Sequence, residues 1–129
     1  MRLLLDTHTL VWALSSPRQL TPRIQALVAD EGNEISFSAA SILEIAVGRG
    51  ARRRNAPALP SEDAAALARR AGYSMLPVTD VHAAVVETIS PFHGDPFDKL
   101  LLAQAQVEGL RLVTHDAALA AYDRRAILF

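Results

Sequence analysis

Short apolar runs alternate with helix-like segments along the whole chain, and this alternation limits the fold more than any other feature. The runs that we interpret as strands are residues 2–5, 34–37, 73–78, 111–114 and 126–129. Strands that alternate with helices predict an α/β fold with a central, mostly parallel sheet of four or five strands, covered on both faces. The chain of 129 residues is long enough for one compact domain, which we expect to span residues 1–129.

Helix start and stop signals divide the segments between these runs. Thr21-Pro22 and Asp95-Pro96 place a capping side chain before a proline at the first helical position, and Gly109 follows the second of these helices. The predicted helices are residues 9–14, 22–30, 38–47, 61–72, 80–89, 95–108 and 117–122. Residues 51–60 have turn and charge character and are predicted to form a loop.

Composition excludes several classes of function. The chain has no cysteine, which excludes disulfides, thiolate nucleophiles and cysteine-bound zinc. A formal charge of −1 argues against a dedicated electrostatic nucleic-acid binder, so contact with a polyanion would need a local patch or a bound cation. Asp6 and His8 interrupt the apolar N-terminal stretch, which argues against a signal peptide. No apolar run approaches the length of a membrane span, and we expect a soluble, cytoplasmic protein.

Four acidic residues each have an ordinary structural interpretation. Asp6 and Asp116 both precede a predicted helix and fit the pattern of plain N-caps. Ser41-x-x-Glu44 matches a capping box, and Asp98 stands where a capping box that begins at Asp95 would place its acid. Taken singly, each acid except Asp95 fits a cap and a functional role about equally well, whereas Asp95 is better explained as a cap.

Taken together, the positions of these acids favour a shared site. Asp6 follows the apolar run Leu3-Leu4-Leu5, and Asp116 follows the predicted strand 111–114, so both lie at the carboxyl ends of strands. That edge of a parallel sheet is where ligands bind. Asp98 begins a helix that is apolar on nearly all sides, and Glu44 lies among apolar neighbours with no Lys or Arg one turn before it.

A buried carboxylate of this kind is normally paired with a cation or a metal. We therefore predict that Asp6, Glu44, Asp98 and Asp116, which we call the four acids, share a divalent cation. Oxygen ligands suit Mg²⁺ or Mn²⁺, and such ions activate water and neutralise the charge of a phosphate under attack. The sequence contains neither a nucleophile elbow nor a glycine-rich phosphate loop, which disfavours serine hydrolases and nucleoside triphosphatases.

Several segments, in this order along the chain, together resemble PIN-domain ribonucleases and in particular the VapC-type toxins of type II toxin–antitoxin pairs. The segments are LLLDTHTLVWAL (3–14), ISFSAASILEIAV (35–47), VHAAVV (81–86) and FHGDPFDKLLLAQAQVEGLRLVTHD (92–116). The resemblance implies a PIN-like three-layer α/β/α fold and hydrolysis of RNA phosphodiesters with Mg²⁺ or Mn²⁺. It also implies a homodimer that a cognate antitoxin keeps silent.

Carried onto this sequence, the resemblance makes Asp6, Glu44, Asp98 and Asp116 the acids that hold the metal and carry catalysis. It makes Thr7 and Thr114 polar helpers near the metal. The segment GRGARRRNAPALP after Glu44 departs from the basic, helical Gly-Lys-Leu segment that is common in the family. This departure affects the expected geometry of the surface where substrate and antitoxin would bind. It does not affect the prediction for the four acids.

Basic and aromatic residues offer further candidates. Arg49, Arg52, Arg53 and Arg54 could either contact RNA phosphates or form a solvated loop, and Lys99 beside Asp98 is a candidate phosphate contact that fits a surface lysine better. Trp12 is expected in the core or in a dimer interface rather than as a base-stacking platform. The four histidines lack the spacing of zinc ligands, and His115 beside Asp116 is the one of interest.

Two other functions are compatible with the same residues. A metal-dependent phosphatase or phosphoacceptor domain also uses carboxylates at strand ends, although the sequence after the first strand is Asp6-Thr7-His8 rather than Asp-x-Asp. A binding module without turnover would use the acids as caps only. The leading hypothesis remains a metal-dependent endoribonuclease.

Overall fold

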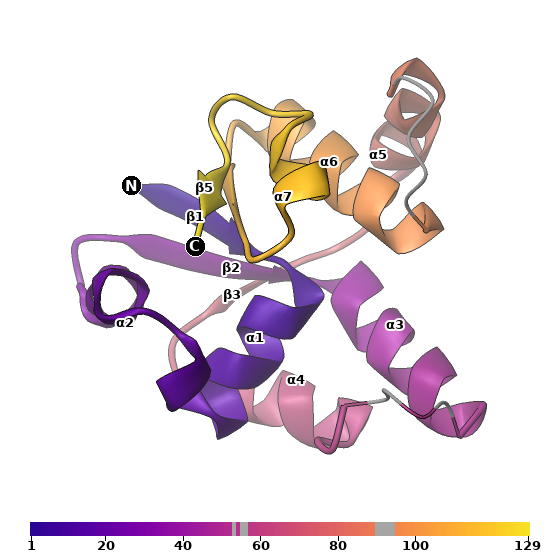
Figure 1. Cartoon of the computed structure of the whole chain (residues 1–129). Coiled ribbons are helices and arrows are strands. Elements are labelled where there is room, and N and C mark those ends of the chain that lie inside the picture. The colour runs from indigo at the N-terminus through magenta and orange to yellow at the C-terminus, as the bar shows by residue number, and fades with distance from the viewer. Residues whose placement is uncertain (53, 55–56, 90–94) are drawn as a thin grey trace.

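A computed structural model describes residues 1–52, 54, 57–89 and 95–129. Its sheet has five parallel strands in the order β3-β2-β1-β4-β5, as Figure 1 shows. The strands are β1 (Arg2–Leu5), β2 (Glu34–Ser38), β3 (Ser74–Leu76), β4 (Arg111–Thr114) and β5 (Ile127–Leu128). The predicted α/β class is confirmed, and the described sheet is parallel throughout.

Helices cover both faces of the sheet, so the molecule has three layers (Figure 1). One face carries α1 (Thr7–Ser15), the short η1 (Pro17–Gln19), α2 (Pro22–Ala29) and α4 (Ser61–Arg70). The other face carries α5 (Asp80–Val85), the short η2 (Val86–Thr88), α6 (Pro96–Glu108) and α7 (Ala117–Ala120).

Successive side chains of the central strand β1 point to opposite faces of the sheet and so enter different core clusters. Leu3 and Leu5 pack in the cluster under α1 and α2, whereas Leu4 packs with the apolar residues of α6, as the two-residue period of a strand requires. All three leucines are fully buried. Burying one leucine side chain contributes about 1.5–3 kcal/mol relative to leaving it exposed, so β1 anchors both layers.

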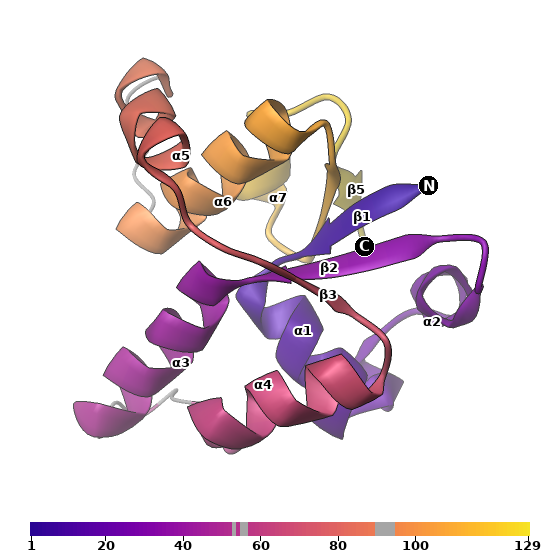
Figure 2. The ribbon, with the colours of Figure 1, turned by 180° about the vertical axis from the view of Figure 1, so that it is seen from behind.

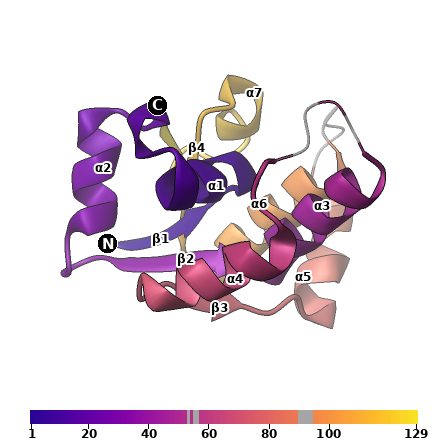
Figure 3. The same ribbon diagram turned by 90° about the horizontal axis from the view of Figure 1, so that it is seen from below.

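Helix α3 (Ala39–Gly50) continues outward from the end of β2 rather than lying on the sheet (Figure 2). Its inner side packs against α1 and α4 through a small cluster of Val11, Ile45 and Ala64. The view from below shows α3 and α5 together at one end of the molecule, with α2 at the other (Figure 3). Much of the surface of α3 is therefore left to solvent.

The chain order creates a switch point in the sheet. From β1 the chain builds β2 and β3 on one side and then returns to place β4 on the other side of β1. The connections after β1 and β4 therefore lead to opposite faces and leave a crevice at the carboxyl ends of these two strands, which is the usual ligand position in an open α/β sheet. Asp6 follows β1 directly, and Asp116 follows β4 after one intervening residue, His115.

Several element boundaries differ from the sequence-based expectation. Pro60 rather than Ser61 is the N-cap of α4, so Ser61 is already helical. The helix that begins at Asp80 is capped by Thr79 and changes to a 3₁₀ turn after Val85, where a single helix to residue 89 was expected. Within the described residues, no helix is long and apolar enough to cross a membrane.

Candidate metal centre

Asp6 is both an N-cap and a member of the candidate site. Its side chain is 6% exposed. The Oδ1 atom accepts a hydrogen bond from the backbone N–H of Thr9 at 2.9 Å, which caps α1. The Oδ2 atom accepts a hydrogen bond from Thr114 Oγ1 at 2.5 Å. The capping interpretation is therefore confirmed, and the second oxygen of the same carboxylate faces the end of β4.

Thr114 connects Asp6 to Asp116. The hydroxyl that donates to Asp6 also accepts a hydrogen bond from the backbone N–H of Asp116 at 3.0 Å. Asp116 Oδ1 accepts from the backbone N–H groups of Ala118 and Leu119 at 2.9 and 3.2 Å and so caps α7. One fully buried threonine thus fixes the relative position of the two strand-end acids.

Glu44 differs from its expected environment in two ways. It was expected to be buried with a metal ion as its only partner, but it is half-buried and accepts a hydrogen bond from Thr7 Oγ1 at 2.6 Å. Thr7 Oγ1 also lies 2.9 Å from Ser41 Oγ. The N-cap of α3 is Ser38, so the capping box expected between Ser41 and Glu44 is absent.

The apolar neighbours of Glu44 do not enclose it. Leu43 is 55% exposed and Val47 is 37% exposed, because α3 leaves the edge of the sheet and presents its outer side to solvent. The apolar residues around Glu44 in the sequence therefore did not predict correctly how buried this part of α3 is. The polar group that holds Glu44 lies on α1, far away in the sequence.

The pKa values show that the four acids lie within electrostatic reach of one another. Burial, followed by the negative charges of Asp95 and of the other three acids, raises the pKa of Asp98 from 3.8 to about 7. Burial also raises the pKa of Glu44, and the hydrogen bond from Thr7 opposes this shift. The pKa of Asp98 thus reflects acids that follow β1 and β4 and one acid of α3.

Asp95 adds a fifth carboxylate that the sequence interpretation treated only as a cap. The cap is confirmed, since Asp95 Oδ1 accepts from the backbone N–H groups of Phe97 and Asp98 at 2.8 and 3.1 Å. Asp95 is also the largest single charge acting on Asp98 and on Glu44. The capping pattern alone explains an Asp at position 95. The sequence therefore did not indicate that the Asp95 charge also raises the pKa of Asp98 and of Glu44.

The oxygen-rich donor set fits a hard divalent cation. The ion pairs seen in the described part of the chain join Arg2 to Glu34 and His82 to Glu108 and involve none of the four acids. No three Asp, Glu or His side chains among those residues form a ready-made metal-binding group, and the direct links are those through Thr7 and Thr114. Carboxylates that repel one another have the chemistry that Mg²⁺ or Mn²⁺ satisfies.

Comparison with protein-family models assigns the chain to a family. The PIN-domain family model matches residues 3–125, a range that contains all four acids. The chain belongs to the PIN-domain family. Members of this family are typically nucleases, and they generally use divalent metals.

Solved structures share the fold of this PIN domain at low sequence identity. VapBC2 from Rickettsia felis, solved with a DNA fragment from its promoter, has a TM-score of 0.67 at 15% identity, with 100% of this chain and 98% of the other covered. A toxin–antitoxin complex from Klebsiella pneumoniae has a TM-score of 0.68 at 21% identity, with coverage of 97% and 95%. FitAcB from Neisseria gonorrhoeae has a TM-score of 0.58 at 19% identity, with coverage of 100% and 97%. No curated protein matches the chain by sequence.

The basic residues of this PIN domain have different environments. Arg49 Nη1 donates to the backbone carbonyls of Pro57 and Ala58 at 2.8 and 2.9 Å and so anchors the loop after α3. Arg52 and Arg54 are exposed and Lys99 is half-buried. Arg53 lies outside the described residues.

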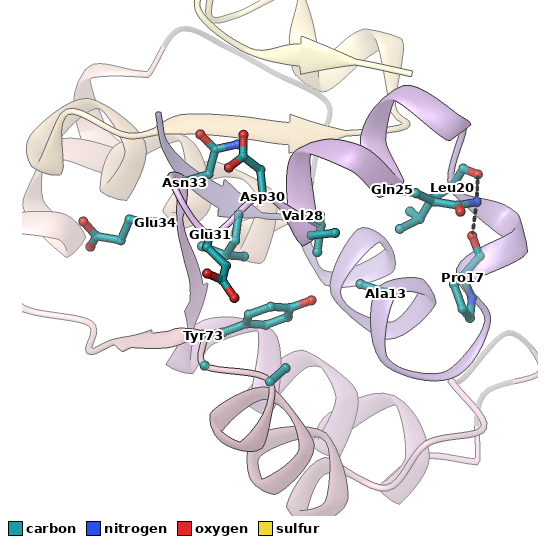
Figure 4. Close-up of a pocket in the computed structure, with 14 residues that line it drawn as sticks. Ala13, Pro17, Leu20, Gln25, Val28, Asp30, Glu31, Asn33, Glu34 and Tyr73 are labelled. Atoms are coloured by element: carbon teal, nitrogen blue, oxygen red, sulfur yellow. Dashed lines mark hydrogen bonds between the residues drawn. The ribbon is translucent and has the colours of Figure 1, made fainter.

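Described residues line a cavity at each of two opposite edges of the sheet. The larger, about 630 Å³, lies at the amino end of β2 between α1 and α2, and Figure 4 shows the Tyr73 ring extending into it. None of the four acids lines it. The smaller, about 190 Å³, is lined by Asp6, His8, Trp12, His115 and Asp116. The smaller cavity therefore belongs to the candidate metal centre.

Proposed function

We propose that this PIN domain is a metal-dependent endoribonuclease and the toxin of a toxin–antitoxin pair. The observation that carries the proposal is the link through Thr114 between Asp6 and Asp116 at the ends of two neighbouring parallel strands. The charges of Asp6, Glu44 and Asp116 also contribute to the raised pKa of Asp98. A site that gathers this much negative charge at the switch point of a parallel sheet suits a cation and, through that cation, an anionic substrate.

Each acid has a distinct part in holding the cation. Asp6 and Asp116, linked by Thr114, would supply oxygens from the strand ends, Asp98 would supply one from the start of α6, and Glu44 would act directly or through water. Mg²⁺ or Mn²⁺, when bound, makes a water molecule more acidic and neutralises charge on the phosphate. The water would lose a proton as its oxygen attacks phosphorus in line. The bond to the 3′ oxygen would break and that oxygen would take up a proton, which leaves a 5′-phosphate and a 3′-hydroxyl.

Exposed basic side chains near α3 support an RNA substrate. The end of α3 at Gly50 lies six residues beyond Glu44, or about 9 Å at 1.5 Å per residue. Arg52 and Arg54 follow it and are exposed, and Arg matches phosphate with forked hydrogen bonds. Lys99 is the neighbour of Asp98 in α6. Arg49 contributes less directly, because its side chain is bonded to the backbone carbonyls of Pro57 and Ala58.

The proposed partners of this chain are based on the solved structures that share its fold. Those solved structures include VapBC2 and a toxin–antitoxin complex, so we propose a cognate antitoxin as the partner of this chain. We also propose a homodimer, because the outer side of α3 carries exposed apolar side chains.

Cleavage of a generic single-stranded RNA with Mg²⁺ or Mn²⁺ tests the proposal, with Asp6→Asn as the variant. Asparagine keeps an oxygen for the Thr9 cap, so the variant should fold. We expect cleavage to fall by about 100-fold or more, since even the outer partners of metal ligands typically contribute about 10- to 100-fold. Glu87→Gln removes an exposed acid of η2 and is the matched control. Equal cleavage by wild type and Asp6→Asn would overturn the assignment of Asp6.

Titration calorimetry with Mn²⁺ separates metal binding from turnover. We expect a heat of binding for the wild type and a weaker interaction for Glu44→Gln, because the substitution removes one negative charge from the group. Cleavage activity that needs no divalent ion, together with no heat of Mn²⁺ binding, would exclude a metal-dependent reaction.

A further inference from the structure

An aromatic pocket adjoins the two strand-end acids. Its walls are His8, Trp12 and His115, and the carboxylates of Asp6 and Asp116 complete the lining. The ring centroid of Trp12 lies 5.8 Å from that of His8 and 5.6 Å from that of His115. Planar rings and the acids of the candidate metal centre therefore share one cavity of about 190 Å³.

Trp12 has the rigidity and the exposure that a stacking surface needs. One side of its ring packs against the main core cluster and lies edge-on to Phe129, with centroids 6.2 Å apart and ring planes at 77°. The residue is nevertheless only half-buried, and His8 and His115 on its other sides are exposed. The sequence analysis expected Trp12 in the core or in a dimer interface, and the contact with the core cluster agrees with the first expectation. The same residue also lines the small cavity.

The histidines are held as ring surfaces around this pocket. The planes of His8 and Trp12 are inclined by 37° and those of His115 and Trp12 by 73°, so the rings diverge around the cavity instead of stacking on one another. His115 Nδ1 is bonded to the backbone carbonyl of Phe129, which fixes that ring. The Trp12 ring therefore forms part of the pocket lining together with Asp6 and Asp116.

We infer that this pocket binds one nucleobase of the RNA next to the phosphate that is cleaved, with Trp12 as the stacking surface. The inference rests on the proposed nuclease function. Every base has a π face, and stacking on an aromatic side chain contributes about 1–3 kcal/mol per base. A base attached to a phosphate at Asp6 and Asp116 would lie within one nucleotide of the cation, so the pocket would set which nucleotide is accepted beside the cleaved bond.

The chain supplies its own probe, because Trp12 is its only tryptophan. Nucleoside 3′,5′-bisphosphates of the four bases, titrated with Mg²⁺, carry a base and phosphates but no diester that a nuclease could cut. We expect saturable quenching of the Trp12 fluorescence by the bisphosphates and none by ribose 5-phosphate at the same phosphate concentration. Equal quenching by ribose 5-phosphate, or none by any bisphosphate, would overturn the inference.

Variants test the same pocket during RNA cleavage. Trp12→Leu should raise KM for RNA by about tenfold, the middle of the stacking range, with kcat changed less than about twofold, and Trp12→Phe should restore most of the loss. Tyr73→Leu removes an aromatic ring that packs against the same core cluster as Trp12 but lines the other cavity, so it controls for altered packing and should leave KM unchanged. An equal rise of KM in Tyr73→Leu would show a packing effect and would contradict base stacking.

The possible failures can be told apart. Base-dependent quenching without RNA cleavage would keep the pocket and reject the nuclease proposal, whereas RNA cleavage without base-dependent quenching would reject the pocket alone. Quenching by an arginine-containing peptide at lower concentrations than any bisphosphate would assign the pocket to a protein side chain and overturn the nucleobase inference.

Discussion

Thr114 shows how one buried hydroxyl can organise two acids. It donates to Asp6 Oδ2 and accepts from the backbone N–H of Asp116, so its loss leaves two polar groups without this partner. We predict that Thr114→Val lowers RNA cleavage by about 10- to 100-fold and the free energy of unfolding by about 1–3 kcal/mol. Thr114→Ser keeps the hydroxyl and is the control. Urea unfolding and cleavage rates measure the two effects, and a Val variant as active as the Ser variant would contradict this role.

Asp98 makes the stability of the metal-free protein depend on pH. Its folded-state pKa is about 7, raised from 3.8 by burial and by neighbouring negative charges. Between about pH 4 and pH 7 the folded state therefore binds more protons than the unfolded state, so the free energy of unfolding falls as the pH rises through this window. The shift of the Glu44 pKa has the same direction.

We predict that the Tm measured in chelator decreases from pH 5 to pH 8 and that Mg²⁺ raises it most at pH 8, where the carboxylates are ionised. Asp98→Asn should flatten the pH dependence, because the group that titrates is gone. Thermal unfolding followed by circular dichroism gives both results. A Tm that rises over this range in the wild type relative to Asp98→Asn would contradict the mutual proximity of the acids.

At the scale of elements, one buried hydrogen-bond pair joins the two helices that carry Glu44 and Asp98. Ser38, the N-cap of α3, donates from Oγ to Gln104 Oε1 of α6 at 2.5 Å, and Gln104 Nε2 donates to the carbonyl of Pro77 at 3.2 Å. Both side chains are fully buried. The pair therefore fixes the start of α3 against the middle of α6, and with it the spacing of the two acids.

A double-mutant cycle on this pair tests its contribution. We predict that Ser38→Ala and Gln104→Met each lower the free energy of unfolding by about 1–3 kcal/mol, since each leaves a buried polar group unpaired. The double variant should lose less than the sum, with a coupling energy of about 0.5–3 kcal/mol. Urea unfolding measures all four states. Strict additivity would show that the two side chains act independently.

Element order could be predicted from sequence, whereas the environment of particular residues could not. The capping signals at Thr21, Asp95 and Gly109 are local, and the helices there begin and end where these residues indicate. The partner of Glu44 is Thr7, a contact that depends on how α1 and α3 pack. The exposure of Leu43 depends on α3 leaving the sheet, which no local pattern encodes.

For the whole molecule, chain order alone explains why distant acids meet. Because β1 and β4 are neighbours and every described strand is parallel, the residues that follow these strands must lie at the same edge. The same geometry is compatible with action on RNA by a chain with a formal charge of −1. A bound cation would offset the negative charge of the four acids, and the exposed Arg52 and Arg54 are available for phosphate contacts.

The oligomeric state is the remaining prediction at this scale. Leu43 and Val47, which are 55% and 37% exposed, lie four residues apart on the same side of α3, and an apolar pair of this kind suits an interface between two copies. We predict a dimer for the wild type by size-exclusion chromatography with light scattering, and a monomer for Leu43→Glu. Val107→Glu alters an apolar residue of α6 that is 39% exposed and should remain dimeric. A monomeric wild type, or a dimeric Leu43→Glu, would place any interface elsewhere. Because Leu43 precedes Glu44, loss of cleavage by a folded monomer would also link dimer formation to the metal centre.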